Sequence, residues 1–176
     1  LQDDILSNNY FDFIWCNGVL HHTKNSRNGF ENIVKSLKQN GYILIGLYNY
    51  YGRFMTRVRK FFYKIFGKTF VEIFDTTLSK HKLDKDEKIF WIKDQYENPL
   101  ETLHTFDEVL LWFKENNIEF INSLPICNFD YGKNNIFIKR SHGTFLSRII
   151  NQLFMIFNVY GIDGGIFIMI GKKNKL

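Results

Sequence analysis

Hydrophobic positions along the chain change their spacing in a way that predicts alternating strands and helices. Residues Phe11–Cys16 are almost continuously apolar, as in a strand buried on both faces of a parallel sheet. Residues 42–48 are a second apolar run. Between these two runs, apolar residues at i, i+3, i+4 and i+7 indicate one face of a helix: Phe30, Ile33, Val34 and Leu37. Asn40-Gly41 is typical of a helix end. The three elements predict a βαβ unit with parallel strands.

The segment 49–104 breaks this alternation. Phe54, Phe61 and Ile65 belong to a helical apolar stripe, and basic residues such as Arg53 and Lys60 occupy another face. An insertion of this length is usually functional or mobile. We therefore expect a helical lid, with the basic face in solvent.

The last third of the chain predicts a helix, a strand, a second helix and a final strand. A capping box at Thr105–Glu108 opens the first helix, and residues 118–122 alternate as a half-buried strand does. Residues 144–160 form a very apolar helix, and residues 166–170 form the last buried strand. We expect the apolar helix to pack in the core or lid, with membrane-surface contact as the alternative.

The run FDFIWCNGVLHHT, a helix, and then NGYILIGLYN resemble the second half of class I S-adenosylmethionine-dependent methyltransferases. The resemblance covers about residues 3–48 and resumes at about 94–123 and 164–173. It implies an α/β, Rossmann-like fold, present in part: a strand-helix-strand unit at 1–48, a lid at 49–104, and a helix with a terminal antiparallel hairpin at 105–176. A helical insertion at about 124–164 would interrupt that hairpin.

The family's glycine-rich loop would lie upstream of Leu1. We therefore expect the chain to be a fragment that is inactive alone, with the Phe11 strand as an exposed apolar edge. Methyl transfer from a sulfonium requires orientation and exclusion of water, so no diagnostic triad is expected.

The resemblance implies that S-adenosylmethionine lies against the loop after the first strand. Asn17, Gly18 and Val19 are the candidate contacts, since a glycine lets the backbone approach a ligand closely. His22 is expected to line the same site, and an acidic residue, Asp4 or its neighbour Asp3, would bind the adenine amine. The alternatives are a plain strand-ending turn, a packed loop histidine and a solvated acidic pair.

Substrate candidates follow the second strand and the lid. Tyr48 and Asn49 end that strand, and Tyr96 and His104 belong to a polar stretch before the Thr105 helix. Ordinary strand termination and helix capping are the alternatives. No catalytic residue is assigned, although His22 and His104 are candidate bases because imidazole titrates near neutrality.

Composition narrows the remaining choices. Two distant cysteines without a Cys-x-x-Cys pair argue against a zinc site, so no metal is expected, and a reducing cytoplasm is favoured. The net charge of +5 is mild. We expect methyl transfer to a small or lipid-like acceptor, without nucleic acid. A non-catalytic binding module and a basic protein that binds nucleic acid or a membrane surface stay open as alternatives.

Overall fold

The computed structural model describes residues 8–80, 83–130, 135–157 and 165–175. In this part of the chain, four strands form one sheet in the order β1-β2-β4-β3. The strands are β1 (Phe11–Asn17), β2 (Leu37–Tyr48), β3 (Ile118–Leu124) and β4 (Ile166–Lys173). β1 and β2 are parallel, whereas β4 is antiparallel to both β2 and β3. The expected antiparallel hairpin at the end of the chain is therefore present.

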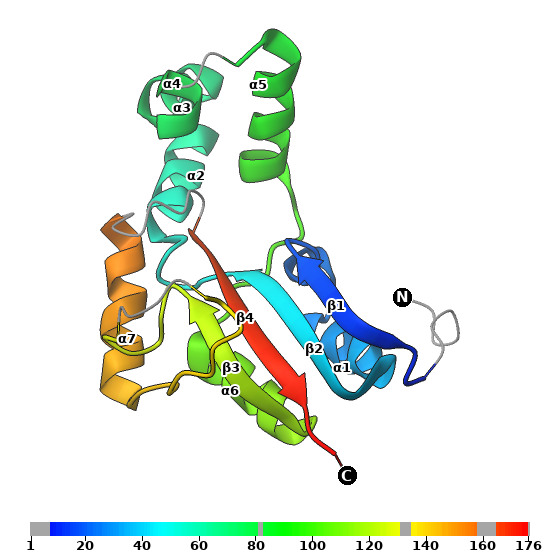
Figure 1. Cartoon of the computed structure of the whole chain (residues 1–176). Coiled ribbons are helices and arrows are strands. Elements are labelled where there is room, and N and C mark those ends of the chain that lie inside the picture. The colour runs from blue at the N-terminus through cyan, green and yellow to red at the C-terminus, as the bar shows by residue number, and fades with distance from the viewer. Residues whose placement is uncertain (1–7, 81–82, 131–134, 158–164, 176) are drawn as a thin grey trace.

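Helices cover one face of the sheet (Figure 1). The helices that pack there are α1 (Ser26–Lys35) and α6 (Phe106–Glu115), with the short turn η1 (Leu20–His22) at the end of β1. Asn25 and Thr105 cap α1 and α6 by accepting hydrogen bonds from backbone N–H groups. Phe30 of α1 and Phe113 of α6 stack with ring centroids 5.8 Å apart. The α/β architecture follows from this burial.

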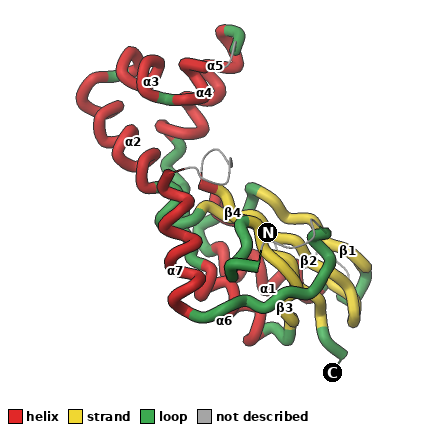
Figure 2. The backbone as a smooth tube through the Cα atoms, turned by 60° about the vertical axis from the view of Figure 1, so that its left-hand side comes forward, coloured by secondary structure: helices red, strands yellow, loops and turns green. Residues whose placement is uncertain are grey.

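Further helices stand above the edge at which β1 and β2 end, and the group forms an elongated arm (Figures 1 and 2). They are α2 (Phe54–Phe66), α3 (Lys68–Phe74), α4 (Thr76–Lys80), α5 (Lys85–Ile92) and the π-helical turn η2 (Lys93–Glu97). We call this group the lid. Its own small core is centred on Val71, Leu78, Ile92 and Tyr96. The last helix, α7 (Phe145–Phe154), continues into the turn η3 (Met155–Phe157) beside the base of the lid.

Three local expectations from the sequence were wrong. The first strand was expected to be buried on both faces, but only Ile14 and Cys16 pack against the core. Phe13 and Trp15 are 42% and 62% exposed, because no described helix covers that face of β1.

Helix α1 ends at Lys35 rather than at Asn40-Gly41, because Leu37 already pairs with Phe11 of β1. Asn40 has a positive φ of 61° within an irregular start of β2, where the register to β1 shifts. An Asn-Gly pair supplies the same left-handed backbone to a helix end and to a strand irregularity, so the pattern did not distinguish them.

The orientation of α2 was also wrong. Its apolar residues Phe61 and Ile65 are 61% and 57% exposed, whereas Arg53, just before the helix, is fully buried. The basic residues of α2 were expected in solvent, but Lys60 turns inward to Glu101. The cause is a buried carboxylate beneath the helix, which draws the cations inward.

Candidate functional site

The carboxyl end of β1 forms an open strip of backbone, Asn17–Val19, that we call the β1 ledge. Gly18 has a φ of +78°, and a side chain added there would meet no atom within 4 Å. Val19 beside it is 54% exposed. The Asn17 side chain lies over β2, where a β-carbon at Gly46 would stand 1.8 Å from Asn17 Oδ1. The glycine at position 46 thus makes room for Asn17.

The ledge has the features of a surface that holds a flat ligand by backbone and apolar contact. It lacks a side chain over Gly18, it presents the apolar Val19, and it lies at the carboxyl end of a parallel strand. The three residues expected to contact S-adenosylmethionine here are therefore adjacent and accessible. Asp3 and Asp4, expected at the adenine, lie outside the described residues.

The two histidines after the ledge have different environments. His21 is 1% exposed and stacks on Tyr48, with ring centroids 3.8 Å apart. Burial, followed by the charges of His22 and Arg53, lowers the pKa of His21 to about 3. His21 is consequently neutral at physiological pH. His22 is only half-buried, and its Nδ1 lies 3.1 Å from both the Leu100 carbonyl oxygen and Asn98 Nδ2.

A buried ion pair lies behind Tyr48 and fixes the base of the lid. Arg53 donates from Nε to Glu101 Oε1 at 2.9 Å and from Nη1 to Gln95 Oε1 at 2.6 Å. Its guanidinium carbon lies 4.0 Å from the centre of the Tyr48 ring, and Gln95 donates to the Tyr48 hydroxyl at 3.3 Å. Lys60 also donates to Glu101. We call these five residues the Arg53 cluster.

The surroundings in the Arg53 cluster determine the charge states of Glu101 and Tyr48. Burial alone would raise the pKa of Glu101, but the hydrogen bonds and charges of Arg53 and Lys60 outweigh burial and lower it. Burial raises the pKa of Tyr48, so its hydroxyl stays protonated. At neutral pH the cluster therefore holds a charged carboxylate between two cations, next to two neutral rings, those of Tyr48 and His21.

A chain of polar contacts connects the end of the lid to the η1 turn. Thr102 Oγ1 lies 2.7 Å from Ser26 Oγ and 2.9 Å from His104 Nε2, and the Thr102 N–H donates to the His21 carbonyl at 2.9 Å. His104 Nδ1 lies 2.9 Å from Glu108 Oε1. Both ring nitrogens of the buried His104 are thus engaged with protein groups. This arrangement suits positioning of the loop.

Two other expected substrate residues point away from the ledge. Asn49 is fully buried, and its Oδ1 accepts from the N–H groups of Tyr51 and Gly52, both at 3.0 Å. Tyr96 lies in the core of the lid, where its hydroxyl donates to the Asp75 carboxylate. Asn49 shapes the turn into α2, and Tyr96 holds the lid together.

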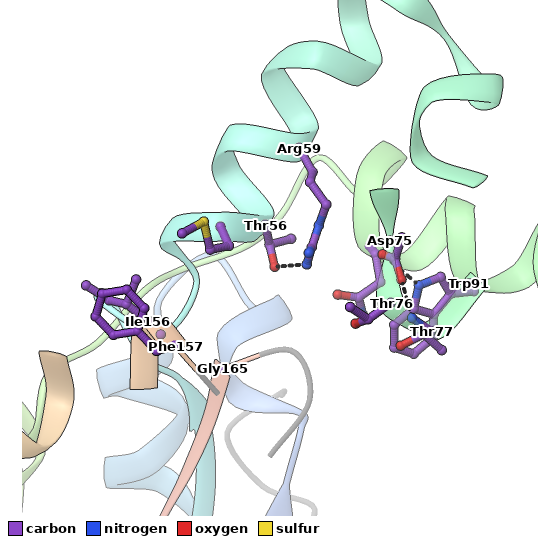
Figure 3. Close-up of a pocket in the computed structure, with 12 residues that line it drawn as sticks. Thr56, Arg59, Asp75, Thr76, Thr77, Trp91, Ile156, Phe157 and Gly165 are labelled. Atoms are coloured by element: carbon purple, nitrogen blue, oxygen red, sulfur yellow. Dashed lines mark hydrogen bonds between the residues drawn. The ribbon is translucent and has the colours of Figure 1, made fainter. Parts of the chain in front are cut away.

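A cavity of about 180 Å³ opens beside the Arg53 cluster. Gln95 lines it, together with Thr56, Arg59 and Thr77. Figure 3 shows Arg59 extending from α2 toward the cavity, with Asp75 and Trp91 on the far side. Trp91 donates from Nε1 to Asp75 at 3.3 Å. The cavity offers a guanidinium, hydroxyls and an amide to a polar ligand.

Sequence reasoning did not identify Arg53, Gln95 and Glu101. Gln95 and Glu101 lie in the polar stretch that was singled out before α6, but their side chains gave no sign of which would face inward. Arg53 matched the pattern of a solvated basic face. The available signal was the position of Arg53, a cation just before a helix whose apolar stripe lies on the other side. In the described residues, no group of three or more His, Cys, Asp or Glu side chains is arranged to hold a metal.

Comparison with known proteins confirms the resemblance found in the sequence. Residues 3–45 match the sequence profile of a family described as "Methyltransferase domain". No curated protein matches the sequence.

The solved structures of PKMT2 share the fold at low identity. PKMT2 from Rickettsia typhi is 13% identical with a TM-score of 0.62, over 99% of this chain and 39% of that one. PKMT2 in complex with AdoHcy is 14% identical with a TM-score of 0.61, over 99% of this chain and 38% of that one. A SAM-dependent methyltransferase from Thermotoga maritima is 12% identical with a TM-score of 0.45, and the match covers 97% of this chain and 59% of that one. The chain thus spans between about two fifths and three fifths of the length of these proteins.

Proposed function

Because the chain has the Rossmann-like fold of the class I S-adenosylmethionine-dependent methyltransferases, we propose that it serves methyl transfer from S-adenosylmethionine. The observation that carries this proposal is the β1 ledge. The segment that matches the methyltransferase profile includes the strand and loop that end in Asn17–Val19, and this is the accessible backbone strip at the sheet's carboxyl edge. The ledge would hold the cofactor by backbone groups and by the Val19 side chain.

The bound cofactor supplies an activated methyl group on a sulfonium, so the residues of this chain bind, orient and exclude water. We place the acceptor between the ledge and the lid. Gln95 lines the polar cavity and also donates to the Tyr48 hydroxyl in the Arg53 cluster. An acceptor bound at the Gln95 end of the cavity would therefore lie near Tyr48. The size of the cavity favours a small molecule or the polar head of a lipid-like one.

His22 is the histidine that we propose to meet the acceptor. His21 is buried and neutral, and both ring nitrogens of His104 are engaged. The Nδ1 atom of His22 already contacts the Leu100 carbonyl oxygen and Asn98 Nδ2, so Nε2 is the ring nitrogen that would face an acceptor. Tyr48 and the stacked His21 would form an aromatic wall beside it.

We also propose that activity needs residues outside this sequence. β1 is the outer strand of the described sheet, and its Phe13 and Trp15 are 42% and 62% exposed. An exposed aromatic edge of this kind normally pairs with another strand. The partial coverage of the solved structures supports the same proposal. Both cysteines are free thiols, in keeping with the proposed cytoplasmic location.

Calorimetric titration with S-adenosylhomocysteine tests the proposal on the protein made from the complete reading frame. Val19→Asp places a carboxylate on the exposed ledge and should weaken binding by at least about tenfold, because the apolar contact is replaced by a solvated charge. Leu111→Asp, at a 48% exposed position on α6, is the matched control and should bind as the unaltered protein does. Equal binding by both variants would move the cofactor site away from the ledge.

A further inference from the structure

Helix α7 presents its apolar side to solvent and its polar side to the protein. Phe145 and Leu146 are 65% and 66% exposed, and Phe157 in the following turn is 70% exposed. On the side of the helix away from the exposed Leu146 and Leu153, Asn151 and Gln152 are fully buried. This is the reverse of the arrangement that a surface helix of a globular protein normally shows.

The buried polar side of α7 is held by specific hydrogen bonds, so the reversal is built into the fold. Gln152 Oε1 accepts from Asn49 Nδ2 at 2.9 Å and from the Phe106 N–H at 3.0 Å. Asn151 donates to the Ser147 carbonyl at 2.9 Å. Rotating α7 to bury its apolar side would break the contacts of Gln152 to Asn49 and Phe106, at a cost for each buried polar atom left without a partner. The apolar side must therefore stay outside.

Helix α2 has the same reversed polarity and meets the C-terminal end of α7. Figure 2 shows the two helices following one another along one side of the molecule. Met55 and Phe157 line one cavity, and a β-carbon at Gly52 would stand 3.2 Å from the side chain of Met155. The exposed large apolar side chains of both helices form what we call the outer apolar surface: Phe54, Met55, Val58, Phe61, Ile65, Phe66, Phe145, Leu146, Leu153, Phe154 and Phe157.

The charged side chains that α2 and α7 themselves carry are of one sign. Neither α2 nor α7 contains an Asp or a Glu. Lys64 and Lys68 are exposed next to the apolar stripe of α2. The Arg57 guanidinium lies 4.6 Å from the Tyr50 ring centre and 6.0 Å from that of Phe54, so a cation borders the apolar stripe directly. Large aromatic and aliphatic side chains bordered by cations suit the boundary between acyl chains and anionic headgroups.

We propose that the outer apolar surface docks on an anionic lipid bilayer, with α2 and α7 lying in the interface. An exposed apolar area of this extent marks an interaction site, and its cationic border gives the complementary charge. In the described part of the chain, no helix is long and apolar enough to cross a bilayer. The docking stands on these two helices alone and does not depend on the proposed methyl transfer.

Vesicle flotation of the purified protein made from the complete reading frame tests this proposal, because aggregated protein stays at the bottom of the gradient. The probes are vesicles of phosphatidylcholine alone and of equal parts phosphatidylcholine and phosphatidylglycerol, at low and high salt. We expect flotation with the anionic vesicles, weakened by salt. The paired variants Phe61→Glu/Ile65→Glu and Leu146→Glu/Phe157→Glu should each reduce the bound fraction by at least about tenfold.

The matched control is Phe90→Glu on α5. Phe90 is 73% exposed but lies on another helix of the lid, so its variant should float like the unaltered chain. Circular dichroism checks that each variant is folded, and two independent pairs guard against one that is not. The proposal is overturned if the chain does not float with anionic vesicles at low salt, or if the control loses binding equally. It is also overturned if light scattering shows a dimer that both pairs dissolve without lipid, since a second copy would then cover the surface.

Discussion

The Arg53 cluster makes a sharp prediction about how the lid is attached to the sheet. Arg53 is fully buried and donates to Glu101 and Gln95, and its partner Glu101 has only 10% of its side chain exposed. Arg53→Met keeps most of the aliphatic stem but removes the charge. The variant leaves a largely buried carboxylate that, among the described residues, keeps Lys60 as its ion-pair partner.

The size of the effect follows from these contacts. Removing one partner of a buried pair costs about 3–5 kcal/mol, because the other charge stays buried. Since Lys60 still pairs with Glu101, we expect the lower end, about 3 kcal/mol. With a urea m-value of about 2 kcal/mol/M, the midpoint of unfolding should fall by about 1.5 M. Arg57→Met, at the surface, is the matched control and should cost less than about 1 kcal/mol.

Urea titration at different pH values tests the same contacts a second time, because the free energy of unfolding depends on the charge of Glu101. In the unaltered chain the lowered pKa of Glu101 contributes stability that is present above its unfolded pKa and is lost as pH falls through the folded one. Without Arg53, burial should raise that pKa, so the variant loses stability as pH rises. The deficit of Arg53→Met should therefore be larger at pH 7 than at pH 4. Adding Glu101→Leu should restore about half of the loss. A loss below about 1 kcal/mol, or a deficit independent of pH, would refute this account.

Three further predictions concern single residues. Because the pKa of His21 is lowered to about 3 by burial, the unfolded chain binds a proton that the folded chain does not. Stability should fall as pH drops from about 6.5 toward 3, with a slope of at most about 1.4 kcal/mol per pH unit that His21→Asn removes in urea titrations. A β-carbon at Gly171 would stand 2.2 Å from Ile118 Cγ2, so Gly171→Ala should cost about 1–3 kcal/mol by thermal unfolding, and an unchanged midpoint would contradict this packing. Burial raises the pKa of Cys127 to about 12, so a thiol reagent should label Cys127 only after unfolding, and rapid labelling of the native chain would count against its burial.

The sequence predicted the strands and helices whose apolar residues recur at the spacing of a strand or of a helix face. Helices α1 and α6 and the final strand match their apolar patterns because their apolar residues pack in the core. The first strand lies where its pattern predicts, but only Ile14 and Cys16 pack against the core, whereas Phe13 and Trp15 are exposed. The antiparallel pairing of β3 and β4 came from the resemblance and not from any residue pattern, and the place of β4 between β2 and β3 was not predicted. Periodicity states that a face exists, but it does not state which element the face contacts.

The orientation of α2 and α7 shows this limit most clearly. Both helices are amphipathic, and the natural expectation was that the apolar side packs inward. The apolar sides face outward because polar partners lie beneath both helices. Glu101 lies beneath α2, and backbone and side-chain groups surround Gln152 of α7. Those partners lie 48 and 46 residues away in the chain. Tertiary contacts at such separations leave no mark on local spacing.

The candidate site was predicted in part for the same reason. The β1 ledge follows from a strand end and a glycine, which are local features, and the structure places Asn17, Gly18 and Val19 together. Whether they bind the cofactor stays a prediction. The Arg53 cluster joins β2, α2 and the end of the lid, so it appears only when the chain is folded.

The central claim is that the β1 ledge is the cofactor surface, and amide NMR of the complete reading frame's protein tests it most directly. On addition of S-adenosylhomocysteine, the account predicts saturable shifts of the Gly18 and Val19 amide signals, with little change for Leu111 on α6. If the two ledge signals stay in place while the ligand binds elsewhere, or if no signal moves, the claim is contradicted.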